Sequence, residues 1–306
     1  MVETTIAASI SDGHTTQSEA VAAQTRDLVH MASLSPAYRA ALTAALTLPG
    51  NILSGNPDAR WGRIVLMCCT AVGGRWEEAV PSAAAVELFM AALDLLDDAE
   101  DGEENAVQAS LGSARALNAS TGLLFLAHQG LLDAAGKPAL RILLAAGLQA
   151  CDGQDADLIT PSTDRPTDLN TAMDISAGKS ASLVAAICRL GALCADADET
   201  VQDLYARFGW HVGLVKQLAN DIAGIRPGAV GKTDRALGRP TLPLTYAALY
   251  PSTSGSGPSP GLSDGGPTYL TWAVADAYRR RALALIPQMT AGDDARADLA
   301  TLLDVL

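Results

Sequence analysis

Residues 93–101 read Leu-Asp-Leu-Leu-Asp-Asp-Ala-Glu-Asp, and this stretch carries most of what the sequence says about fold and chemistry. Its aspartates follow one another at i, i+3, i+4 and i+7, a spacing that puts their carboxylates on one helix face. They are Asp94, Asp97, Asp98 and Asp101. Because apolar residues recur at helical spacing before them, we expect a central helix over residues 83–101.

Like charges on one helix face repel each other, so a bound cation would make this arrangement favourable. Magnesium fits best, because it accepts few carboxylates and completes its shell with water and phosphate oxygens. The pattern therefore predicts chemistry on a metal-bound diphosphate. The alternative is an acidic helix end that runs into an exposed loop at 102–105, where the carboxylates only keep the surface soluble.

The composition favours one large helical domain. The chain has 306 residues, of which 49% are hydrophobic and only 4% aromatic, with alanine and leucine dominant. We expect a flexible leader at 1–25 and a single all-helical domain at 26–306. A net charge of −13 argues against a nucleic-acid partner, which needs clustered lysine and arginine.

Five cysteines without metal-binding spacing indicate free thiols in a reducing cytoplasm. Charges or glycines interrupt every apolar run before it reaches membrane-spanning length, so we expect a soluble protein rather than an integral membrane protein.

Further helices are expected where apolar residues keep a helical period. Their ranges are 111–135, 173–194, 201–225 and 269–289. Turn-forming residues without such a period predict a connecting loop at 151–170. The low-complexity stretch at 251–267 predicts a mobile loop.

A second polar seam lies on the helix expected at 201–225. Gln217, Asn220 and Asp221 share one face there. Lys179 stands between Gly178 and Ser180, and such small neighbours would let a diphosphate approach closely. The alternative for each lysine alone is a surface residue whose stem packs on apolar neighbours.

Together these motifs resemble the polyprenyl synthetase family, the trans-isoprenyl diphosphate synthases and their relatives. Residues 97–101 match the family's first motif, D-D-x-x-D, and Lys179 matches its mid-chain lysine. Residues 217–221 resemble its second motif, and Lys232 lies in a loop of the G-K-x-x-D type. Residues 239–246, RPTLPLTY, resemble the family's K-x-T-L-P-L-x-Y segment, and residues 116–123 resemble a ComQ-like branch of pheromone-modifying prenyltransferases.

The resemblance implies an all-α, class I isoprenoid synthase-type antiparallel helical bundle around a central apolar cavity. Two acidic helices would face each other and bind about three magnesium ions, which hold the diphosphate of an allylic prenyl substrate. The catalytic residues implied are Asp97, Asp98, Asp101, Gln217, Asn220 and Asp221, with Asp97, Asp101 and Asn220 as metal ligands. The diphosphate contacts implied are Lys179, Lys232, Arg60 and Arg239.

The substrate pocket is predicted below the first motif. Phe89, Ala92 and Leu93 lie one to two turns before Asp97 and should form its floor. Because Ala92 and Leu93 are not bulky aromatics, we expect room for a chain of fifteen or twenty carbons. The resemblance also favours a homodimer.

Three departures from the family pattern concern the second substrate. Of the family's G-K-x-x-R-P motif only Arg60 remains, residues 103–111 contain no basic residue, and the second motif lacks its leading and final aspartates. A second diphosphate would therefore lack counter-charge. We accordingly expect a terpene synthase (cyclase) acting on one allylic diphosphate. The alternatives are a prenyltransferase, either an elongating enzyme or a ComQ-like enzyme with a non-diphosphate acceptor, and a non-catalytic partner subunit.

Overall fold

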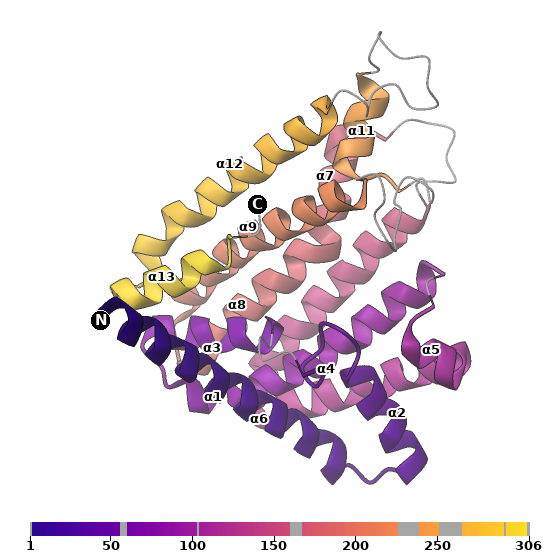
Figure 1. Ribbon diagram of the computed structural model, residues 1–306, viewed down its shortest axis with the longest axis vertical. Coiled ribbons are helices and arrows are strands. Elements are labelled where there is room, and N and C mark those ends of the chain that lie inside the picture. Colours follow the sequence, from indigo (N-terminus) through magenta and orange to yellow (C-terminus); the bar gives the residue numbers. More distant parts are fainter. Residues whose placement is uncertain are drawn as a thin grey trace. The chain divides into compact units, whose positions relative to one another are not determined.

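The computed structural model describes residues 2–55, 60–102, 104–159, 167–225, 239–250, 265–290 and 292–304, with side chains from residue 16 onward except that of residue 60. Within these ranges every regular element is a helix (Figure 1). The chain divides into two compact units, Met1–Arg141 with Leu190–Asp198, and Ile142–Arg189 with Glu199–Leu306. The expected all-α class is confirmed.

The first unit is built around the apolar helix α4. Its helices are α1 (Val2–Met31), α2 (Pro36–Leu46), α3 (Arg60–Val72), α4 (Trp76–Glu100), α5 (Ala106–Leu111) and the first part of α6 (Ser113–Ile159). Helix α4 packs against α1 and α3. Its alanines Ala83, Ala84 and Ala85 are fully buried, and their small side chains let the neighbouring helices come close. This packing holds the end of α4, and with it the first acidic motif.

Helix α1 runs through the segment where we expected a flexible leader. Val21 and Thr25 are fully buried, and the Thr25 hydroxyl donates to the carbonyl oxygen of Val21. Residues 16–25 therefore belong to a packed helix. A single domain from residue 26 onward stays a prediction.

Helix α6 has a kink at Gly136, whose φ of 73° lies in the left-handed region that glycine adopts without steric cost. The predicted helix 111–135 is confirmed from Ser113 to this kink, whereas Leu111 ends α5 and Gly112 separates the two helices. After Pro138 the helix continues to Ile159. The predicted loop is therefore wrong for residues 151–159, and residues 160–166 lie outside the described part of the chain.

The second unit contains the remaining elements. They are the last part of α6, α7 (Leu169–Ser176), the π-helical turn η2 (Ala177–Ala181), α8 (Ser182–Cys194) as far as Arg189, α9 (Glu199–Gly224), α11 (Leu242–Leu249), α12 (Gly266–Met289) and α13 (Asp293–Thr301). Helix α12 packs along α9 and also contacts α11 and α13 (Figure 1). Tyr205 of α9 is fully buried and its hydroxyl donates to the carbonyl oxygen of Met289. The helices predicted at 173–194, 201–225 and 269–289 are confirmed, apart from the π-turn inside the first.

Within the described part of the chain, two segments are long and apolar enough to cross a membrane by composition, Trp76–Glu100 and Leu169–Cys194. In the first, 72% of the apolar window is buried inside the protein, and in the second 56%. Core helices of soluble proteins give the same signal, so these segments are weak evidence for a membrane span.

Candidate functional site

The first acidic motif lies at the C-terminal end of α4. Asp97 and Asp98 are in its last turn, and Asp101 is the capping residue that follows. The Asp98 carboxylate accepts a hydrogen bond of 2.8 Å from the side-chain amide of Asn105. Asn105 also caps the start of α5, so Asp98 is tied to the next helix along the chain. The predicted helical spacing of the aspartates is confirmed.

The electrostatics at this helix end favour a cation. The C-terminus of a helix carries the negative end of its dipole, and the last turn of α4 contains no basic residue. Among the described residues no three His, Cys, Asp or Glu side chains are preassembled as a metal site. The carboxylate oxygens of Asp97, Asp98 and Asp101 are ligands of the kind that suits Mg²⁺, which takes few protein ligands and completes its shell with water and substrate oxygens.

The second motif lies on α9 and shows one internal contact. The Gln217 amide donates to Asp221 Oδ1 at 2.9 Å, one helical turn away. Asp221 is buried at 3% exposure, whereas Asn220 is exposed. The structure thus brings Gln217 and Asp221 together, with Asp221 on the buried side of the helix and Asn220 on the exposed side.

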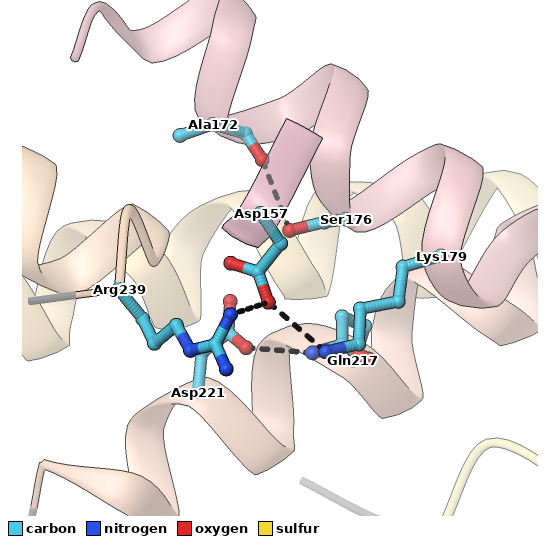
Figure 2. Close-up of polar contacts among 7 residues, drawn as sticks. All are labelled: Asp157, Ala172, Ser176, Lys179, Gln217, Asp221 and Arg239. Atoms are coloured by element: carbon cyan, nitrogen blue, oxygen red, sulfur yellow. Dashed lines mark hydrogen bonds and ion pairs between the residues drawn. The ribbon is translucent and has the colours of Figure 1, made fainter. Parts of the chain in front are cut away.

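Two of the predicted diphosphate-binding cations converge on one carboxylate. Lys179 Nζ and Arg239 Nη1 both donate to Asp157 Oδ2, at 3.0 Å and 3.2 Å (Figure 2). Lys179 belongs to η2, Arg239 precedes α11, and Asp157 lies in the last turns of α6. Asp157 and Arg239 are each 7% exposed and therefore buried, whereas the Lys179 side chain is partly buried. Figure 2 shows Gln217 and Asp221 in the same close-up as these three residues.

Close backbone packing places Lys179 beside Asp157. A Cβ atom added at Gly153 would lie 2.5 Å from the backbone nitrogen of Lys179, so α6 and η2 touch backbone to backbone. Gly178 packs in turn on Gly153, since a Cβ at Gly178 would lie 3.2 Å from the Gly153 Cα. The small residue at Gly178 therefore makes room for a helix, not for a diphosphate as the sequence alone indicated. The π-turn that carries Lys179 is a deviation often found at functional sites.

Two predicted diphosphate contacts have no described side chain. Lys232 lies outside the described residues, and Arg60 begins α3 but its side chain is not described.

The two residues after Arg60 donate their backbone N–H groups to Glu87 Oε1, from Trp61 at 3.2 Å and from Gly62 at 2.6 Å. Glu87 is 3% exposed, and burial raises its pKa to about 7 although these two hydrogen bonds lower it.

The predicted pocket residues line the buried side of α4. Phe89 is 3% exposed and its ring lies 5.9 Å from the ring of His128 on α6. Ala92 is fully buried, and its carbonyl oxygen accepts a hydrogen bond from Ser120. Burial lowers the pKa of His128, so its imidazole is neutral at physiological pH. Leu93 is half-buried, and the role of these side chains as a pocket floor stays a prediction.

The sequence interpretation missed Asp157, because residues 151–159 show no apolar period. The structure explains this: the inward positions of that turn are Gly153 and Asp157, four residues apart. A glycine and a carboxylate at i and i+4 are compatible with a helix whose buried face meets another backbone and two cations. That spacing is the signal that could have identified the residue.

With this geometry in place, the chain can be compared with known proteins. The family model for polyprenyl synthetase matches residues 58–254. The chain belongs to the polyprenyl synthetase family. The match covers the acidic motif of α4, the Lys179–Asp157–Arg239 cluster and the Gln217–Asp221 pair, so the family resemblance deduced from the motifs is confirmed.

Individual relatives and structures agree. A (2E,6E)-farnesyl diphosphate synthase of Mycobacterium tuberculosis is 34% identical over 207 residues, covering 63% of this chain and 57% of that enzyme. The tryptophan prenyltransferase ComQ of Bacillus spizizenii is 27% identical over 157 residues, covering 50% of this chain and 53% of that protein. The chain thus matches little more than half the length of these relatives.

A crystal structure of a polyprenyl synthetase from Streptomyces coelicolor has a TM-score of 0.80 and 23% identity, and the match covers 96% of this chain and 98% of that one. This likeness establishes the fold as the all-α isoprenoid synthase type.

Proposed function

We propose that the chain is a magnesium-dependent prenyltransferase that ionises an allylic prenyl diphosphate of fifteen or twenty carbons and transfers the prenyl group to a second substrate. The observation that carries this proposal is the convergence of Lys179 and Arg239 beside the Gln217–Asp221 pair, in a chain whose curated relatives are prenyltransferases. The relatives favour transfer over the cyclisation that the sequence departures indicated.

The acidic motifs would hold the metal. On α4, Asp97 and Asp101 would offer oxygen ligands, with Asp98 beside them in the motif. On α9, Asn220 would do the same next to the Gln217–Asp221 pair. Bound Mg²⁺, about three ions in the family pattern, would neutralise the diphosphate so that it departs with the bonding electrons. Lys179 and Arg239 would donate hydrogen bonds to its oxygens, with Lys232 and Arg60 as further contacts. These donors stabilise the charge that develops on the leaving group.

The apolar side chains of α4 would shield the allylic cation from water. Phe89 and Ala92 have no polar side-chain atom that could trap a cation, and Leu93 continues this apolar lining. His128, held neutral by burial, adds no positive charge next to Phe89. The length of the product should therefore depend on the size of these side chains.

Product analysis tests the proposal. The purified protein is incubated with Mg²⁺, farnesyl or geranylgeranyl diphosphate, and radiolabelled isopentenyl diphosphate. A labelled diphosphate one prenyl unit longer is the expected result. Absence of any Mg²⁺-dependent release of diphosphate from either substrate would overturn the proposal and favour a non-catalytic partner subunit.

A terpene synthase is the second candidate, and two observations favour it. First, residues 103–111 contain no basic residue. Second, the backbone N–H groups of Trp61 and Gly62 at the start of α3 already donate to the Glu87 carboxylate of the same chain. In the same incubation without isopentenyl diphosphate, a hydrocarbon or an alcohol would identify this function. Diphosphate release that requires a tryptophan-containing peptide would instead identify a ComQ-like acceptor.

We further propose a homodimer in the cytoplasm, without integration into a membrane. Helix α6 exposes apolar side chains in one stripe of the first unit: Leu117 at 41%, Phe125 at 70% and Leu132 at 39%. Exposed apolar patches of this kind mark protein interfaces. Light scattering should give twice the mass of the chain, and Phe125→Glu should give the monomer mass. A monomeric wild-type protein would contradict the dimer.

A further inference from the structure

We propose that Asp157 is a positioning residue, which holds Lys179 and Arg239 together in the arrangement that receives the substrate diphosphate. This inference rests on the proposed function, because it assumes that the two cations bind a diphosphate. It assigns a role to a carboxylate at the end of α6 that belongs to neither acidic motif.

The contacts single out one oxygen atom. Asp157 Oδ2 accepts from Lys179, which is 22 residues away in the chain, and from Arg239, which is 82 residues away. Two cations that share one oxygen lie close enough to repel each other strongly in a buried site. The carboxylate between them offsets that repulsion, so the pair is assembled before any ligand arrives.

Asp157 occupies only part of the donor capacity of each cation. An ammonium group has three donor hydrogens and a guanidinium has five, and the hydrogen bonds to Asp157 use one from each. Asp157 can therefore keep both side chains oriented while other N–H groups bind phosphate oxygens. A carboxylate of this kind acts with the diphosphate instead of competing with it.

The backbone around Asp157 is closely packed. Gly153, one helical turn earlier, packs directly on the backbone of Lys179, and Arg239 is buried at 7% exposure. A preassembled site of this sort binds more tightly because little side-chain freedom is lost on binding. Loss of the Asp157 charge should therefore weaken diphosphate binding.

This expectation has the opposite sign from simple charge counting. Asp157→Asn makes the site more positive by one charge, which alone would tighten the binding of an anion. We expect instead that the Kd of inorganic pyrophosphate with Mg²⁺, measured by calorimetry, rises about tenfold. The KM of the allylic diphosphate should rise by a similar factor, while kcat at saturation changes less than about threefold.

Two comparisons isolate the effect. Asp155→Asn makes the same charge change at an exposed position of α6 and should leave the Kd within about twofold. In a Lys179→Met background, Asp157→Asn should weaken binding by less than about threefold, because one of the two side chains it orients is already absent. An effect of the full size in that background would show that Asp157 acts independently of Lys179.

Asp157→Glu provides a second variant in case Asp157→Asn does not fold. It keeps the charge but moves the carboxylate by one methylene group, and we expect a Kd raised at least about threefold. Pyrophosphate binding as tight as wild type in the folded variants would overturn the inference. A wild-type protein that neither binds Mg²⁺ with pyrophosphate nor releases diphosphate would overturn the proposed function itself, which keeps the two failures distinct.

Discussion

Replacing Glu87 by glutamine removes a carboxylate that lies inside the first unit at 3% exposure. Burial raises the pKa of Glu87 from its ordinary value of 4.5 to about 7. The folded protein therefore binds this proton more tightly than the unfolded chain does. The contribution of Glu87 to stability is present below pH 4.5 and is lost as the pH rises through 7.

The shift sets the size of the effect. A pKa difference of this extent lowers the free energy of unfolding by about 3 kcal/mol once the carboxyl is fully ionised. From about pH 5.5 to about pH 8.5 the linkage relation lowers the stability of the wild type by about 2 kcal/mol. Glutamine does not ionise, and its carbonyl oxygen can still accept the N–H groups of Trp61 and Gly62. Glu87→Gln should therefore escape this loss.

Thermal unfolding of both proteins across that pH range measures the difference. We expect the stability of Glu87→Gln relative to the wild type to rise by about 2 kcal/mol from the acidic to the alkaline end of this range, or on the order of 4 °C in Tm. Glu78→Gln, an exposed change on the same helix, is the control and should stay within about 0.5 kcal/mol at every pH. A difference that is constant with pH, or that moves in favour of the wild type as the pH rises, would refute the reasoning.

Three further predictions concern the site. Asp97→Asn should reduce Mg²⁺-dependent diphosphate release at least about 100-fold without unfolding the protein. The exposed change Glu104→Gln should leave the rate of release unaltered. Equal rates for Asp97→Asn and wild type would contradict the metal-binding role of the motif. Phe89→Ala should destabilise the protein by about 3 kcal/mol and lengthen the product by one prenyl unit, and unchanged product length would reject the pocket role. Gly153→Ala should destabilise the protein by about 1–3 kcal/mol, because the added Cβ would lie 2.5 Å from the Lys179 backbone nitrogen. The variant should also bind pyrophosphate more weakly. A Gly153→Ala protein as stable as wild type would contradict the close packing.

Helices with an apolar period could be predicted from the sequence, since local spacing determines them. Helix α4 and its acidic end were predicted because Phe89, Asp97 and Asp101 all lie within a few turns of each other. The same holds for α9 and α12. The family followed from several short motifs in a fixed order, which a single sequence displays in full.

The ion cluster could not be predicted in this way, because its partners are distant in the chain. The sequence places Asp157 in a polar loop, and only the fold brings it to Lys179 and Arg239. At Gly178 the sequence predicts space for a ligand, whereas the structure fills that space with α6. Glu87 was hidden inside an apolar run, and its two donors come from another helix.

A crystal structure with Mn²⁺ in place of Mg²⁺ and a non-hydrolysable thiolo analogue of farnesyl diphosphate tests the central claim most directly. The account predicts anomalous metal density bonded to Asp97 and Asp101 and to the diphosphate, whose other oxygens contact Lys179 and Arg239. An analogue bound without metal, or bound away from both acidic motifs, would contradict it.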